Sequence, residues 1–156
     1  MKITIRMLNF VTMLLLVVIF FSCSSSTVMK TPPATDDGYT LLPFKKVINP
    51  AFAEEGANKW IRCKVKFMNI NTVVMDLPAK YRKDFVRIMV TDPNDMTSIS
   101  MRVVIPKSKS DLVFELKMQD TIELFAYLVP ITSTSAVSGR SQSNILFEVA
   151  KLRKIE

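Results

Sequence analysis

The chain has 156 residues, two cysteines, three glycines and no histidine, and its formal net charge is +7. The absence of histidine removes the commonest general base and the usual zinc ligand. Three scattered glycines, Gly38, Gly56 and Gly139, exclude a glycine-rich phosphate loop. Composition therefore favours neither hydrolytic, zinc-dependent nor nucleotide-binding chemistry, and we expect no catalytic residue, no metal site and no cofactor.

The N-terminal segment has the pattern of a signal peptide. Lys2 and Arg6 form a short basic region, and residues 7–22 are almost wholly apolar. A helix of this length spans about 24 Å, less than the roughly 30 Å hydrocarbon core of a bilayer. The length favours the apolar region of a signal peptide over a membrane-spanning helix.

This apolar segment ends in Phe20-Phe21-Ser22-Cys23, followed by a run of serines at 24–26. The ending resembles the lipobox of bacterial lipoproteins, in which a small residue precedes an invariant cysteine, although Phe20 stands where leucine is usual. The resemblance implies cleavage before Cys23 and acylation of its thiol and new amine, with fatty acids such as palmitate. Ser24, in place of aspartate, implies the outer membrane, facing the periplasm, in a host with two membranes. The alternative is an ordinary secretory signal with a chance cysteine.

The remaining chain divides by composition. Residues 1–22 are the predicted signal peptide, residues 23–43 a flexible tether rich in Ser, Thr and Pro, and residues 44–156 one domain of about 110 residues. Loss of the signal leaves 19 basic and 14 acidic residues, a net charge of +5. That balance favours anionic partners such as lipid headgroups, acidic glycans or nucleic acid.

Alternation of apolar and polar residues predicts most of the domain's strands. In residues 59–70, Ile61, Cys63, Val65 and Phe67 face one way, so Cys63 is expected to be a buried, unpaired thiol. A helical turn at 51–55, ended by Gly56, precedes this strand. The other predicted elements are strands at 84–91, 98–105, 121–129 and 145–152, a turn at 92–95, a short helix at 108–119 capped by Ser108 or Ser110, and a polar loop at 130–144.

The order β-β-β-α-β-β resembles the OB-fold, a five-stranded Greek-key barrel. The passage from Ser108 through Gln119-Asp120 into the strand ending at Val129 is similar to the corresponding passage of small bacterial OB-fold proteins. The resemblance covers roughly residues 57–153 and implies an all-β, OB-like barrel with one short helix. An irregular β-sandwich is the main alternative.

The polar face of the strand at 59–70 is the sharpest candidate site. Trp60, Arg62, Lys64 and Lys66 place an aromatic plane beside a row of cations, which suits a flat or anionic ligand. The alternative is a solvated strand face. The OB resemblance implies that Arg87, Arg102 and Arg140 join this surface, and the loop at 130–144 is a second candidate.

The acidic turn at 92–95 is interpreted as structural. Asp92, Asn94 and Asp95 could begin a calcium loop, but Val103 stands where an EF-hand needs an acidic ligand. The sequence as a whole predicts a non-catalytic envelope lipoprotein, held to the membrane at Cys23, that binds a protein, glycan or other envelope component. The alternative is an anion- or nucleic-acid-binding module at the cell surface.

Overall fold

The computed structural model describes residues 30–71, 77–134 and 141–155. The predicted signal peptide, Cys23 and Arg140 lie outside the described residues. The chain divides into two compact units, residues 1–30 and 31–156, of which the second contains the barrel. None of the helices found in the described ranges is both long and apolar enough to cross a membrane.

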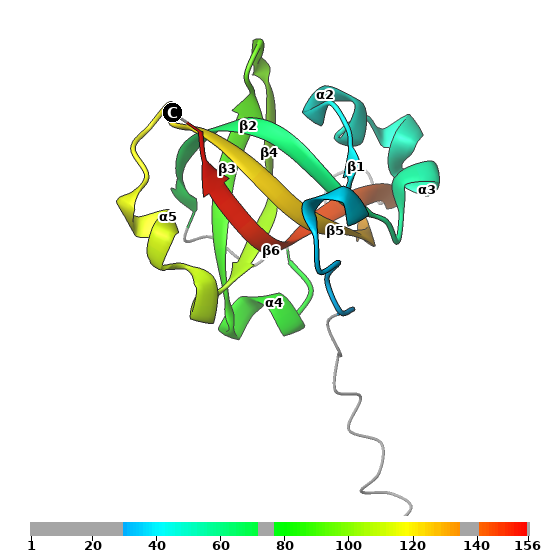
Figure 1. Cartoon of the computed structure of the whole chain (residues 1–156). Coiled ribbons are helices and arrows are strands. Elements are labelled where there is room, and N and C mark those ends of the chain that lie inside the picture. The colour runs from blue at the N-terminus through cyan, green and yellow to red at the C-terminus, as the bar shows by residue number, and fades with distance from the viewer. Residues whose placement is uncertain (1–29, 72–76, 135–140, 156) are drawn as a thin grey trace, which may run out of the picture. The chain divides into compact units, whose positions relative to one another are not determined.

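The strands of the described ranges form one sheet that closes into a barrel (Figure 1). The strands are β1 (Thr40–Leu41), β2 (Trp60–Asn71), β3 (Phe85–Asp92), β4 (Asp95–Pro106), β5 (Thr121–Thr134) and β6 (Ser141–Lys154). The sheet order is β1-β2-β3-β4-β6-β5, and β2 also pairs with β5. Antiparallel ladders join all the barrel strands except β4 and β6, which run parallel at Val103 and Val104. The expected all-β, OB-like five-stranded barrel is confirmed, and β1 is a short addition to it.

The barrel interior is filled by the inward positions that alternation predicts. Ile61, Cys63 and Val65 are 0 % exposed, and Ile88 and Val90 on β3 are equally buried. Each such aliphatic side chain contributes about 1.5–3 kcal/mol when it is fully buried. The thiol of Cys63 is free and buried, as expected.

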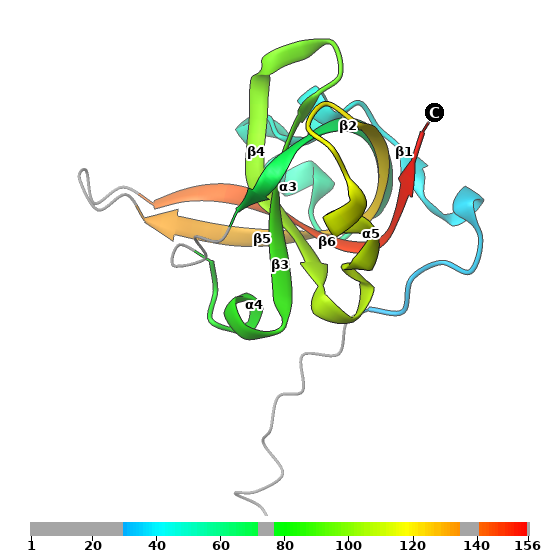
Figure 2. The ribbon, with the colours of Figure 1, turned by 90° about the vertical axis from the view of Figure 1, so that its left-hand side faces the viewer.

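The prediction of a polar loop at 130–144 is wrong for most of that range. β5 continues to Thr134 and β6 begins at Ser141, with Ile131 opposite Asn144 in the ladder. Figure 2 shows this hairpin reaching outward beyond the barrel. Pairing of the two strands satisfies the backbone groups although the Ser- and Thr-rich sequence carries no apolar alternation. Residues 135–140 of the predicted loop lie outside the described ranges.

Short helices are more numerous in the described ranges than the helix at 108–119 and the helical turn at 51–55 that we expected. They are the 3-10 turns η1 (Asp36–Gly38), η2 (Pro50–Phe52) and η3 (Lys107–Lys109), and the α-helices α2 (Phe44–Val47), α3 (Ala53–Gly56), α4 (Lys80–Lys83) and α5 (Asp111–Glu115). Each spans about one turn, too little to establish a helical period in the sequence.

The helix predicted at 108–119 is confirmed in position but not in length. α5 ends at Glu115 because Leu116 is extended, and Gln119 has a left-handed φ of 76°. Ser110 occupies the N-cap without capping a backbone N–H; its Oγ donates to the carbonyl of Lys107 at 2.8 Å. The predicted capping interaction is therefore wrong.

The N-terminal part of the folded unit corrects the tether boundary. Residues 31–41, called the strap from here on, pack on the barrel: Thr40 pairs with Ile61 in a parallel bridge. Tyr39 is only 6 % exposed. The tether expected over residues 23–43 therefore cannot extend past the start of the strap. Composition missed this because the strap is held by contacts with residues far along the chain.

A second apolar cluster lies outside the barrel and fixes α4. Leu77 and Tyr81 pack against Val104 and Leu146, whose side chains face away from the barrel core. Tyr81 is 1 % exposed, and its hydroxyl donates to Oε2 of Glu148 at 3.0 Å. One buried anchor thus holds this single-turn helix against the outer wall of the barrel.

Candidate functional site

The predicted polar row lies on the outer face of β2, but its first two members are covered. Trp60 stands between two other rings, at 5.6 Å from the Tyr39 centroid and 5.1 Å from the Tyr127 centroid. Arg62 is half-buried, and its Nε is enclosed with no hydrogen-bond partner among the described residues. These two side chains therefore do not offer an open stacking surface while the strap is in place.

The strap is held over this face by rings and by charge. The Tyr39 ring meets Phe125 edge-on at 5.1 Å. Asp36 accepts hydrogen bonds from Nζ of Lys151 at 2.9 Å and from Nη1 of Arg153 at 3.2 Å. The Lys151 ammonium, as the first cause, lowers the pKa of the Asp36 carboxyl group. Arg153 also pairs with the nearly buried carboxylate of Glu123.

Lys64 and Lys66 remain on the uncovered part of the row. Lys64 is exposed and Lys66 half-buried. β1 pairs with β2 only as far as Arg62, and β3 begins its ladder at Lys66, so neither strand covers the edge of β2 at Lys64.

An open groove of about 600 Å³ lies beside this gap. Its lining combines the apolar side chains of Leu41, Leu42 and Pro43 with the charged side chains of Lys64 and Asp92. Leu41 is 59 % exposed. This volume falls within the usual range of about 300–1,000 Å³ for ligand pockets. Because the Asp92 carboxylate already accepts two backbone N–H groups, the Lys64 ammonium beside the apolar lining suits an extended or flat ligand that carries a negative charge.

The arginines that the OB resemblance added are not brought into this row. Arg87 is 4 % exposed, and its Nε donates to the carbonyl of Met101, so its charge is not presented to a surface ligand. Arg102 instead lines a small cavity of about 80 Å³ with Ser100 and Asn144. Arg140 lies outside the described residues.

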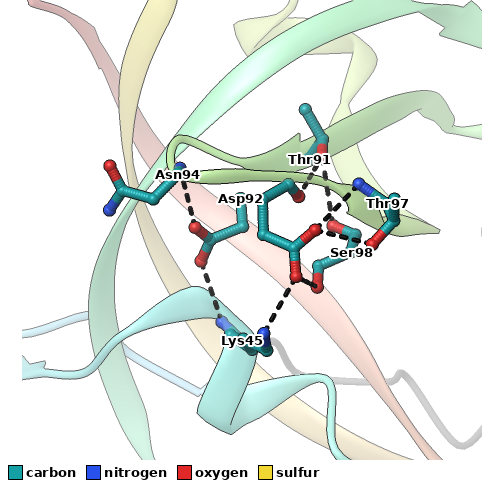
Figure 3. A network of polar contacts seen from close by, with 7 residues as sticks. Lys45, Thr91, Asp92, Asn94, Thr97 and Ser98 are labelled. Atoms are coloured by element: carbon teal, nitrogen blue, oxygen red, sulfur yellow. Dashed lines mark hydrogen bonds and ion pairs between the residues drawn. The ribbon is translucent and has the colours of Figure 1, made fainter.

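The acidic turn between β3 and β4 is a structural network that ties α2 to the barrel (Figure 3). Asp95 accepts from Nζ of Lys45 at 2.9 Å and from the hydroxyl groups of Thr97 and Ser98 at 2.6 and 2.8 Å. These bonds, with that from Thr97 first, hold the pKa of Asp95 well below its usual range. In the described ranges no group of three or more acidic or cysteine side chains could hold a metal ion.

Asp92 is held in the same network. Its carboxylate accepts the backbone N–H of Lys45 at 3.3 Å and that of Asn94 at 2.9 Å. Figure 3 shows the Asp92 carboxylate directed toward the backbone donors of Lys45, on α2, and of Asn94, in its own turn. The predicted turn is confirmed.

The thiol of Cys63 is unsuited to nucleophilic chemistry. Burial inside the barrel, as the first cause, and the negative charge of Glu123 raise its pKa to about 12. A thiol with such a pKa stays protonated at neutral pH, and the thiolate is the reactive form.

Comparisons with known proteins add no family. A scan against protein-family models and a search of curated proteins both found no match. Among solved structures, the chain is similar to one named as an aspartyl-tRNA synthetase from Leishmania major Friedlin, with 14 % identity and a TM-score of 0.49. The match covers 81 % of this chain and 22 % of that one. A likeness at this level carries no argument about function.

Proposed function

We propose that this protein is a bacterial envelope lipoprotein whose OB-like barrel is a non-catalytic binding module held at the membrane through Cys23. The observation that carries the proposal is the apolar segment at 7–22, which ends in Ser22-Cys23 and a run of serines. Several acyl chains on one cysteine would make the anchor stable, because each buried CH₂ contributes about 0.8 kcal/mol.

The strap shortens the reach of such an anchor. The folded unit begins at Thr31. On this proposal eight residue steps separate it from the anchor at Cys23. Eight residue steps at full extension span at most about 28 Å. On this account the barrel works close to the membrane surface, on partners that are already there.

The proposal of a non-catalytic binding module is supported by the partners of three carboxylate groups, which all belong to the fold itself. Glu123 is paired with Arg153, Glu148 accepts the hydroxyl of Tyr81, and Asp95 is held by Lys45. Each of these contacts joins elements of the fold, which is a structural role. The groove beside Lys64 is then the site for a ligand, and an envelope protein segment or a glycan is the class of ligand proposed for it.

Metabolic labelling tests the anchor. Cells given labelled palmitate are expected to incorporate it into the wild-type chain and into Cys63→Ser, which keeps Cys23. Cys23→Ser is expected to lose the label and to leave the membrane fraction. Label retained in Cys23→Ser, or absent from the wild type, would contradict the proposal. Turnover of an envelope substrate that one change in the barrel abolishes would contradict its non-catalytic part.

The exposed ammonium of Lys64 favours a second candidate function, in which the barrel binds an anion or nucleic acid at the cell surface. This function predicts binding that weakens steeply with salt, since cation–phosphate contacts release counterions. The double variant Lys64→Glu/Lys66→Glu should then lose binding to a labelled oligonucleotide. Binding that is indifferent to both salt and these changes would dismiss this candidate.

A further inference from the structure

Five basic side chains gather at the end of the barrel where α4 lies. Lys80, Arg82 and Lys83 come from α4, and Lys107 and Lys109 come from η3; all five are exposed. The N–H of Lys107 donates to the carbonyl of Asp84 at 2.9 Å, which joins the two segments although they are distant in sequence. We call these five side chains the basic end.

The basic end is a fixed surface. Tyr81 anchors α4 in the outer apolar cluster, and its ring meets Phe85 at 5.1 Å. The Nε of Arg82 donates to the carbonyl of Leu77 at 2.9 Å, and Nζ of Lys109 to the carbonyl of Ala150 at 3.1 Å. These two side chains are thus held in place, although both residues are exposed.

The charge balance of this surface is strongly positive. The segments 80–84 and 107–111 contain five basic and two acidic residues, Asp84 and Asp111. Their net charge of +3 is more than half of the +5 expected for the chain without its signal. A surface of this kind attracts anionic lipid headgroups, and each basic residue near the bilayer raises partitioning about fivefold.

The start of the folded unit lies on the same side. Lys109 bonds to the carbonyl of Ala150 on β6, and the next residue of β6, Lys151, pairs with Asp36 of the strap. η3 and the strap therefore flank the same part of β6. Both views place the beginning of the coloured chain near the end of the barrel where α4 lies (Figures 1 and 2).

We infer that the basic end contacts the anionic phospholipid headgroups of the membrane that carries the Cys23 anchor. This inference rests on the proposed lipid anchor and adds the orientation of the barrel to it. A tether of at most about 28 Å keeps this end of the barrel within reach of the bilayer. The contact fixes which face of the barrel is turned away from the membrane toward its partners.

Residue-resolved amine acetylation tests the contact. The lipidated mature protein is reconstituted in vesicles of phosphatidylcholine alone, or of phosphatidylcholine with about one third phosphatidylglycerol, and lysine acetylation is followed by mass spectrometry. The anionic vesicles should slow acetylation of Lys80, Lys83 and Lys107 at least about fivefold, which is the effect of one basic residue at the surface. Acetylation of Lys64 should not change. About 0.5 M salt should remove the protection, because it shortens the screening length to a few ångströms.

Charge reversal supplies the matched comparison. Lys83→Glu/Lys107→Glu should lose the protection of Lys80, whereas Lys64→Glu/Lys66→Glu should keep it. Both pairs reverse the charge of two lysines, of which only Lys66 is half-buried. Circular dichroism before and after reconstitution checks that each variant retains the barrel. Protection of Lys80 that survives reversal of Lys83 and Lys107 would overturn the inference.

The possible outcomes distinguish a failure of the proposed lipid anchor from a failure of the proposed contact between the basic end and the membrane. A chain recovered without lipid at Cys23 contradicts the proposed function and removes this inference with it. A lipidated chain with equal acetylation rates in the two kinds of vesicle overturns the inference alone. Protection of Lys83 and Lys107 by soluble heparin or duplex DNA, but not by anionic vesicles, overturns it in favour of a soluble polyanion.

Discussion

The strap predicts the effect of Tyr39→Ala. The Tyr39 side chain is 6 % exposed and makes edge contacts with the rings of Trp60 and Phe125. Truncating a buried aromatic side chain costs about 3–5 kcal/mol, of which each ring pair supplies about 0.5–1.5 kcal/mol. The strap contributes only a two-residue strand to the sheet, so β2–β6 stay closed when it leaves. We therefore expect local release of the strap, with a loss of global stability smaller than the full truncation cost.

Two signals report on this release. Trp60 is the one tryptophan in the sequence, so its emission should shift to longer wavelength as the Tyr39 ring is removed. The N–H of Leu42, which donates to the carbonyl of Arg62 at 3.0 Å, should exchange with solvent much faster. Tyr39→Phe keeps the ring and serves as the control, with both signals unchanged. Unaltered emission and unaltered Leu42 exchange in Tyr39→Ala would refute the role assigned to the strap.

Three further predictions concern the barrel and its turns. Because burial raises the Cys63 pKa from 9.0 to about 12, the folded state holds its proton more tightly, and stability present below pH 9 is lost as pH rises toward 12. In alkaline denaturation the wild type should lose about 4 kcal/mol of its free energy of unfolding by pH 12 through Cys63, and Cys63→Ala should not show this loss. The same pH dependence of stability in the two proteins would contradict the prediction. Hydrogen bonds, first that from Thr97, lower the pKa of Asp95. The ionised carboxylate therefore stabilises the folded state above about pH 4, and this stabilisation is lost as the pH falls. In Asp95→Asn the free energy of unfolding should depend less on pH in the acid range. An unchanged midpoint of acid denaturation would argue against the stabilising role of the network. Gly56→Ala would place a Cβ 2.3 Å from the buried Phe52 ring, so thermal unfolding should show a loss of about 1–3 kcal/mol, and equal stability would show that the ring moves aside.

Most of the strands could be predicted because the alternation of apolar and polar residues that marks their buried faces is visible in the local sequence. Ile61, Cys63 and Val65 alternate with polar residues, and this pattern alone assigns them to the barrel interior. The ends of β5 and β6 escaped prediction because Ser- and Thr-rich segments carry no such pattern. Their backbone pairing, for example at Thr134 and Ser141, depends on the partner strand and not on the local sequence.

The candidate site could be predicted only in part. Alternation correctly assigned Trp60, Arg62, Lys64 and Lys66 to the outer face of β2. It could not show that the strap, 19 or more residues away in sequence, covers the first two of them, since that depends on long-range contacts of Asp36 and Tyr39.

The basic end was missed for the same reason. The segment Lys80-Tyr81-Arg82-Lys83 and the pair Lys107 and Lys109 are visible in the sequence as basic runs. Their proximity depends on the packing of α4 against the barrel wall and on the bond between Lys107 and Asp84. Basic runs in separate loops indicate one surface only when the fold joins them.

The mass of the N-terminal peptide of the mature protein tests the central claim most directly. The protein is extracted from membranes in detergent, digested, and its first peptide is sequenced by mass spectrometry. The account predicts a chain that begins at Cys23 and carries a diacylglyceryl group on its thiol. A mature chain that begins at another residue, or one with an unmodified thiol at Cys23, would contradict it.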